Sequence, residues 1–309
     1  MGSKFLLVKN KVKKFKKILK VDGDKSISIR WLLLASQAIG ISKAKNLLRS
    51  EDVLSAIRCL KKLGIKIKLS KQNCIIYGRG INGFKFKKNL TLNAGNSGTV
   101  GRLILPLLIK SPYKIKIIGD KSLSRRDFSR VIEPLSKIGV KFFPKGKKQL
   151  PISILGSNYL RPIDYFEKRG SAQCKTSVIL ASLNTPGEMR IFAKRSRNHT
   201  ELMFKNLKMP IIIKKKGEID FIKASRPDKL KAFNLDVPGD ISSGAFFIAL
   251  TLLSKNSYLV LKNINLNPSR LGVIKILNKM GAGIKTKNIK SNKGESCGDI
   301  IVKSNKKLK

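Results

Sequence analysis

Four short polar clusters in this sequence each begin with a glycine and lead directly into an apolar stretch. Hydroxyl, amide and backbone N–H groups at a helix start, together with the helix dipole, form a ready binding site for phosphate or carboxylate. In the first cluster Ser26 and Arg30 are four residues apart and share one helix face, and Lys25 lies beside them. Ordinary helix capping is the simpler explanation for any single cluster. Their recurrence in four places favours the binding of anionic ligands.

The clusters recur with a regular period. They start at Gly23, Gly95, Gly170 and Gly239, at intervals of 72, 75 and 69 residues. A second helical pattern follows in each unit, and short runs typical of strands surround it. The sequence therefore predicts a repeated unit of strand, helix, strand, helix and two further strands. Because the first helix of every unit is nearly all apolar, we expect all four of these helices to be buried.

Composition narrows the class of protein. A chain of 309 residues with 42% hydrophobic residues is long enough for two domains. The formal charge of +48 suggests an anionic partner, and nucleic acid is the first candidate. However, the lysines are spread over the whole chain, and no zinc-finger, RNP or basic-zipper pattern accompanies them. A lysine-biased solvated surface explains the charge at least as well, so nucleic acid is not favoured as a partner.

Targeting and metal-binding signals are weak. No apolar run approaches the roughly 20 residues that cross a bilayer, so no membrane span is predicted. The basic N-terminus lacks a long apolar region and a cleavage site, and we expect a cytoplasmic protein. The four cysteines are far apart and a single histidine accompanies them, which predicts neither a disulfide framework nor a metal site.

Seven ordered motifs resemble those of the 5-enolpyruvylshikimate-3-phosphate synthase family, also called 3-phosphoshikimate 1-carboxyvinyltransferase. The resemblance extends from about Val21 to Gly283 and is carried by "GDKSISIR", "GNSGT", "GDKSLSRRDFSRVIEPLSKIG", "SAQCKTSVILASLNTPG", "SRNHTE", "VPGDISSGAFFIAL" and "NPSRLGVIKILNKMGA". It implies an α/β (α+β) fold, an inside-out α/β barrel of repeated βαβαββ units in two domains. Residues 22–236 would form a complete domain of three units. Residues 1–21 and 237–309 would form a partial second domain, with an N-terminal strand and about one unit.

The resemblance also implies a reaction. The enolpyruvyl (1-carboxyvinyl) group of phosphoenolpyruvate would pass to the 5-hydroxyl of shikimate-3-phosphate, giving 5-enolpyruvylshikimate-3-phosphate and phosphate. This is a step of the shikimate pathway to chorismate and the aromatic amino acids. The implied partners are the two small-molecule substrates, without a metal or organic cofactor, and the implied protein is a monomer.

Site residues follow from the matching motif positions. Lys25 would touch both substrates and is the candidate for proton transfer. The residues implied to bind shikimate-3-phosphate are Lys25, Ser26, Arg30, Ser171, Gln173 and Arg197. Those implied to bind phosphoenolpyruvate are Lys25, Asn96, Gly98, Arg126 and Gln173, with Arg125 as the neighbouring alternative to Arg126. A surface cation is the simpler interpretation for each arginine, and helix capping is the simpler one for Ser171 and Gln173.

The sequence departs from the family pattern at several positions. Asp22, Ile29, Asp127 and Asn198 stand where the family commonly has Pro, His, Pro and Asp. The period places a fifth helix start just past Lys309, and the family's catalytic aspartate and "ELRxKESDR" motif would lie beyond it. We therefore expect a C-terminally truncated member with background phosphate release. The alternatives are an inactive remnant that at most binds shikimate-3-phosphate, and a basic nucleic-acid-associated protein that reuses the fold.

Overall fold

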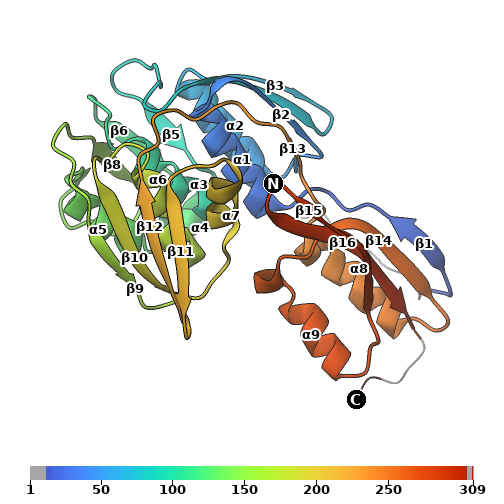
Figure 1. The fold of residues 1–309 in the computed structure, drawn as a ribbon. Helices are drawn as coiled ribbons and strands as arrows, with labels where there is room; N and C mark the ends of the chain where they lie inside the picture. Colours follow the sequence, from blue (N-terminus) through green and yellow to red (C-terminus); the bar gives the residue numbers. More distant parts are fainter. Residues whose placement is uncertain (1–11, 305–307, 309) are drawn as a thin grey trace. The chain divides into compact units, whose positions relative to one another are not determined.

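The computed structural model describes residues 12–304 and residue 308 (Figure 1). These residues form two compact units. The larger unit contains Gly23–Val237 and Asn292–Glu295. The smaller unit contains the described residues up to Asp22, Pro238–Ser291 and the described residues from Ser296.

The larger unit is built from three similar repeats. The elements of the first repeat are α1 (Lys25–Ser36), β2 (Ile39–Lys45), α2 (Glu51–Lys62), β3 (Lys66–Ser70) and β4 (Asn73–Arg79). The elements of the second are β5 (Thr91–Asn93), α3 (Gly98–Leu103), a 3₁₀ turn (Leu105–Leu107), β6 (Ile115–Ile118), α4 (Lys121–Ser124), α5 (Ser129–Ile138), β7 (Lys141–Phe143) and β8 (Ile152–Leu155). The elements of the third are β9 (Asp164–Glu167), α6 (Ala172–Ala181), β10 (Glu188–Lys194), α7 (His199–Asn206), β11 (Ile211–Lys216) and β12 (Ile219–Ser225).

The smaller unit contains a fourth repeat. Its elements are α8 (Ile241–Leu253), β14 (Tyr258–Asn265), a 3₁₀ turn (Pro268–Arg270), α9 (Gly272–Lys279), β15 (Lys285–Asn292) and β16 (Glu295–Lys303). The pattern of strand, helix, strand, helix and two strands is thus present in four copies within the described chain, as the sequence predicts.

The sheets share one topology, but two strands are exchanged between repeats. Within the described residues the strand orders are β13-β2-β4-β3, β5-β6-β8-β7, β9-β10-β12-β11 and β1-β14-β16-β15. The strand that precedes α1, β1 (Lys16–Leu19), runs parallel to β14. The strand that precedes α8, β13 (Leu235–Asp236), runs parallel to β2. The first and fourth repeats therefore each complete their sheet with the strand that precedes the other repeat.

Local sequence explains how the helices begin and end. Asp24 caps α1 by accepting a hydrogen bond from the N–H of Ile27, 3.0 Å away. Two acidic residues lie in the first turn of α2 and two lysines in its last turn, which complements the helix dipole. Gly139 ends α5 with a positive φ of 119°, a conformation that glycine adopts without steric cost.

The first helices of the larger unit form its core. All ten residues from Ile27 to Ser36 of α1 are buried, Trp31 among them. Helix α3 packs against α1 and α6, and the sheets surround this helical centre (Figure 1). Burial of the first helices is confirmed for these repeats.

The expected burial is wrong for the first helix of the fourth repeat. On α8, Phe246 and Leu253 are each 80% exposed, and Phe247 and Leu250 are also exposed. In the larger unit each first helix packs against another first helix. In the described part of the smaller unit α8 packs on β14 without an equivalent helix beside it.

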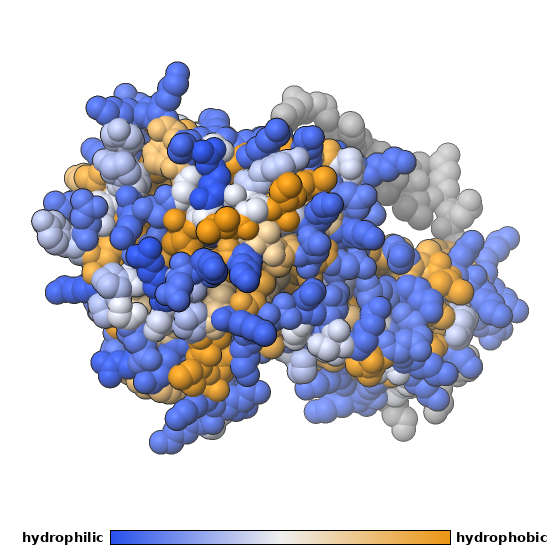
Figure 2. Space-filling view, turned by 45° about the horizontal axis from the view of Figure 1, so that its top comes forward, coloured by the Kyte–Doolittle hydropathy of each residue, from blue (hydrophilic) through white to orange (hydrophobic). Residues whose placement is uncertain are grey.

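The surface is mainly hydrophilic and the cysteines are buried, as the composition and the spacing of the cysteines suggest. Figure 2 shows a face on which hydrophilic residues predominate and apolar residues form separate groups. All four cysteines are buried and form no disulfide, and burial raises the pKa of Cys59 to about 11. None of the helices in the described chain is long and apolar enough to cross a membrane. Within residues 12–304 and 308, no group of three or more His, Cys, Asp or Glu side chains could hold a metal ion.

Candidate functional site

The start of α1 presents an accessible ammonium group. Lys25 is the first residue of the helix, directly after the cap Asp24, and its side chain is 44% exposed. Its Nζ lies 3.7 Å from Oδ2 of Asp52, near the start of α2. Ser26 follows and is half-buried. The structure thus brings a cation and a hydroxyl group to one helix start, as the motif predicts.

Arg30 lies deeper than its two neighbours in the motif. It is only 4% exposed, and its Nε donates to Oγ1 of Thr200 at 2.8 Å. Its two Nη atoms donate to the Ser26 carbonyl at 3.1 Å and to Oγ1 of Thr176 at 3.4 Å. Burial lowers the pKa of Arg30 to about 10, against the opposing charge of Glu201, so the group stays charged at neutral pH. Arg30 therefore connects α1 with α6 and α7.

A second group of predicted residues gathers around α3 and α4. Arg126 donates to the side-chain oxygen of Asn96 at 3.1 Å, and the Asn96 amide donates to Asp120. Asp120 caps α4, and hydrogen bonds from the Leu123 N–H and from Asn96 lower its pKa. Of the two neighbouring arginines, Arg126 is the one whose contact with Asn96 the structure records. This contact favours Arg126 over Arg125 as the member of the site.

Gly98 permits a close approach of two guanidinium groups. A Cβ at this position would lie 2.9 Å from Nη1 of Arg102 and 3.2 Å from Nη1 of Arg126. Carbon atoms this close to both groups would displace at least one of them. A glycine therefore leaves room for both guanidinium groups in the positions that the structure shows.

Arg102, which the sequence analysis did not predict, contacts several of the predicted site residues. Its Nη1 donates to Oε1 of Gln173 at 2.9 Å, and its Nη2 donates to the Asp127 carbonyl at 2.9 Å. Its guanidinium also lies 4.8 Å from the centre of the Phe128 ring. Burial lowers the pKa of Arg102. It ties α3 to α6 and to the segment after Arg126, and its position four residues after Gly98 repeats the Ser26 to Arg30 spacing.

The start of α6 places the last two predicted contacts. Ser171 caps the helix, and its Oγ accepts from the Cys174 N–H at 3.3 Å. The Ser171 N–H donates to Oε2 of Glu167 at 2.8 Å, so a buried carboxylate holds this segment. The Gln173 amide donates to Oγ1 of Thr99 at 3.1 Å. Ser171 therefore caps α6, as the capping interpretation expects.

Arg197 lies on the surface just before α7. The side chain is exposed, and its positive charge is one of the smaller contributions, after burial, that lower the pKa of Arg30. The next helix begins at His199, which is buried and pairs through Nδ1 with Oε1 of Glu295 at 2.7 Å. Glu295 thus has a structural partner in the larger unit.

Buried charges stabilise the base of the site. Lys175 is fully buried one turn after Ser171, and its Nζ lies 2.7 Å from Oε1 of Glu201. Asp220, on β12, is 3.9 Å from the same ammonium group. A buried ammonium group needs such partners, because a lone buried charge is costly. The pair connects α6 with α7, close to the buried hydroxyls that hold Arg30.

The fold and these helix starts define an α/β protein of repeated βαβαββ units, with cations and hydroxyl groups gathered at the starts of its first helices. The family model for EPSP synthase (3-phosphoshikimate 1-carboxyvinyltransferase) matches residues 9–305. The chain belongs to this family. The family assignment favours the transferase over the nucleic-acid alternative.

Individual relatives agree with the family match. The chain is 40% identical to the 3-phosphoshikimate 1-carboxyvinyltransferase of Oenococcus oeni over 93% of its own length and 64% of that protein. It is 39% identical to the enzyme of the same name from Streptococcus pyogenes serotype M1, over 94% of its length and 66% of that protein. A solved EPSP synthase from Acinetobacter baumannii matches with a TM-score of 0.86 and 33% identity, covering 96% of this chain and 66% of that one. The predicted fold class is confirmed, and the chain spans slightly less than two thirds of the relatives' length.

Proposed function

We propose that this protein binds shikimate-3-phosphate and phosphoenolpyruvate and takes part in the transfer of the enolpyruvyl group between them. The observation that carries the proposal is the network centred on Arg102. This network joins Gly98, Gln173 and the segment of Arg126, three positions assigned to substrates from the motifs. The family membership supports the same substrates.

Each residue has a proposed role. Lys25, Ser26, Arg30, Ser171, Gln173 and Arg197 would bind shikimate-3-phosphate, and Lys25, Asn96, Gly98, Arg126 and Gln173 would bind phosphoenolpyruvate. Arg30 is buried, so it would also hold Ser26 and the adjoining helices in place. Charge-assisted hydrogen bonds from the arginines would neutralise the phosphate and carboxylate groups.

The reaction is addition followed by elimination. The 5-hydroxyl would lose its proton as its oxygen bonds to C2 of phosphoenolpyruvate, and the C2–C3 double bond would take up a proton at C3. The tetrahedral adduct would then lose a proton from C3, which restores the double bond as the C2–O bond to phosphate breaks and phosphate leaves. We propose the Lys25 ammonium group as a proton donor to C3, since it is accessible at the start of α1. A monomeric, cytoplasmic protein without an organic cofactor is part of the same proposal, and sedimentation would measure its oligomeric state.

Binding measurements test the part of the proposal that these residues carry. Calorimetry with shikimate-3-phosphate should give saturable binding that Lys25→Ala weakens by at least about tenfold, the loss expected for one charge-assisted contact of about 1.5–3 kcal/mol. Phosphoenolpyruvate should then bind to the saturated protein, and Arg126→Gln should weaken that step while the neighbouring Arg125→Gln does not. Absence of shikimate-3-phosphate binding at millimolar concentration would overturn the proposal.

A further inference from the structure

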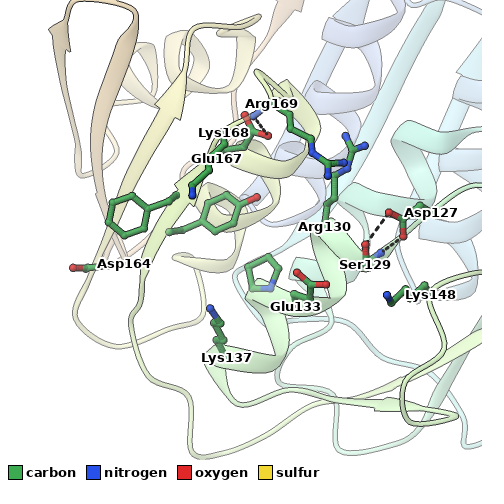
Figure 3. Close-up of a pocket in the computed structure, with 13 residues that line it drawn as sticks. Asp127, Ser129, Arg130, Glu133, Lys137, Lys148, Asp164, Glu167, Lys168 and Arg169 are labelled. Carbon is green, nitrogen blue, oxygen red and sulfur yellow. Dashed lines mark hydrogen bonds between the residues drawn. The ribbon is translucent and has the colours of Figure 1, made fainter.

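A cavity of about 550 Å³ lies in the larger unit between α5 and β9 (Figure 3). Its volume is in the range of small-molecule sites. The residues assigned to the two substrates do not line it. However, one wall ends at Asp127, directly after Arg126, and another ends at Arg169, two residues before Ser171.

The cavity has an excess of unpaired positive charge. Nine charged side chains line it, five basic and four acidic: Arg130, Lys137, Lys148, Lys168 and Arg169, and Asp127, Glu133, Asp164 and Glu167. In the described chain, none of the five basic side chains has a carboxylate within ion-pair distance. The cations are therefore available to a ligand.

Three of the four carboxylates are already engaged. Asp164 pairs with Arg190, outside the cavity, at 2.8 Å. Asp127 accepts from the N–H and the hydroxyl of Ser129, each at 2.8 Å. Glu167 accepts from the backbone N–H groups of Arg169 and Ser171, at 3.2 and 2.8 Å. None of these contacts is an ion pair with one of the five basic side chains of the cavity.

Two arginines reach the same wall of the cavity from different elements. Arg130 comes from the first turn of α5 and Arg169 from the segment after β9, and both guanidinium groups lie at the upper wall in Figure 3. Guanidinium groups that line one cavity can both donate to an anion, and their planar donors match phosphate and carboxylate oxygens. Pro134 and Tyr165 add an apolar surface nearby.

We propose that Arg130 and Arg169 form a binding site for a small organic anion, separate from the positions assigned to the substrates. The phosphate or carboxylate group of the ligand binds the two guanidinium groups. Its apolar body, a ring or short hydrocarbon, packs against Pro134 and Tyr165. This site goes beyond the proposed function, because its ligand need be neither of the two substrates.

Calorimetry on the full chain at physiological salt tests the site with two probes, phenyl phosphate and benzoate. We expect saturable binding of at least one, and the stronger binder identifies the preferred anionic group. The double variant Arg130→Gln, Arg169→Gln should weaken that binding at least tenfold. Both side chains are exposed, so the variant should fold, and its melting temperature checks this.

A matched control removes the same charge from a neighbouring cavity. Lys141 and Lys145 line an adjoining cavity of about 580 Å³, which shares Ser129, Glu133 and Lys148 with the first cavity but neither of its two arginines. The double variant Lys141→Gln, Lys145→Gln should change probe binding less than twofold. Equal weakening in both double variants would mean general attraction to a basic surface and would overturn the proposal. Loss of probe binding in Arg126→Gln would show that the probe binds at the proposed substrate residues, and would also overturn the proposal. So would the absence of saturable binding of both probes.

Discussion

Helices α1 and α8 begin alike but lie in different surroundings. Each follows a glycine and is capped by an aspartate, Asp24 or Asp240, and each is rich in large apolar side chains. Ten consecutive residues of α1 are buried, whereas four of the thirteen residues of α8 are buried. Phe246 of α8 is 80% exposed. Similar apolar sequences therefore reach different burial, because burial depends on which elements pack around a helix.

The helix starts differ less than the helix bodies. At α8, Asp240 accepts a hydrogen bond from the Ser242 N–H at 2.8 Å. At α1, Asp24 accepts from the Ile27 N–H. Caps depend on residues within a few positions of the helix start, so they form in both units. The exposed face of α8 is an apolar surface of the kind that associates with other proteins or aggregates.

We expect the largest loss of stability from a substitution in the buried ion pair of the larger unit, compared with an exposed substitution after α8. Lys175→Met removes one member of a fully buried ion pair and leaves Glu201 without its cation. We expect a loss of about 3–5 kcal/mol in the free energy of unfolding, measured by urea titration. Lys255→Met, an exposed substitution just after α8, should change it by less than about 0.5 kcal/mol. Equal effects would show that the Lys175 pair carries little energy.

The same leucine substitution in both helices tests the comparison directly. Leu33 on α1 is fully buried and Leu253 on α8 is 80% exposed. Leu33→Ala should cost about 2–5 kcal/mol, because it leaves a cavity in the core. Leu253→Ala should lie within about 0.5 kcal/mol of the parent protein. A comparable loss from Leu253→Ala would mean that this face is covered in solution, and would weaken the contrast.

Lysine substitutions on the exposed face of α8 test whether this face is the main accessible apolar surface, without a large change in stability. The double variant Phe246→Lys, Leu253→Lys should lower the fluorescence of a bound hydrophobic dye, because it interrupts the exposed apolar face. Tyr159→Lys, at a 91% exposed position of the larger unit, is the control and should change dye binding much less. Unchanged dye binding in the double variant would place the main apolar surface elsewhere.

Acid sensitivity gives the smallest expected effect. Partial burial opposes ionisation of Asp299, but hydrogen bonds from Lys262, the Asn263 N–H and Asn288 lower its pKa overall. The pKa of Asp299 is about 3.9 in the unfolded protein and lower in the folded protein, so this group stabilises the folded protein above about pH 4. That contribution is lost as the pH falls through the folded-state pKa. Asp299→Asn should therefore flatten the loss of stability below about pH 4, measured by acid titration of circular dichroism. An exposed control, Asp228→Asn, should keep the parent slope.

Part of the candidate site could be predicted because its members are close in sequence. Ser26 and Arg30 share a helix turn, and Ser171 caps the helix that carries Gln173. Arg102 was missed although its spacing from Gly98 repeats that of Ser26 and Arg30, because its partner Gln173 is 71 residues away. The depth of Arg30 is likewise set by Thr200, 170 residues along the chain.

The sequence by itself determined the repeat, the element order and the helix caps. These features depend on hydrogen bonds and side-chain spacing within a few residues, so each repeat carries them independently. The tertiary structure decided that β1 pairs with β14 and β13 with β2, because a strand edge can pair with any suitable strand regardless of sequence distance. It also decided which apolar helices are buried, since burial requires surrounding elements that no single helix encodes.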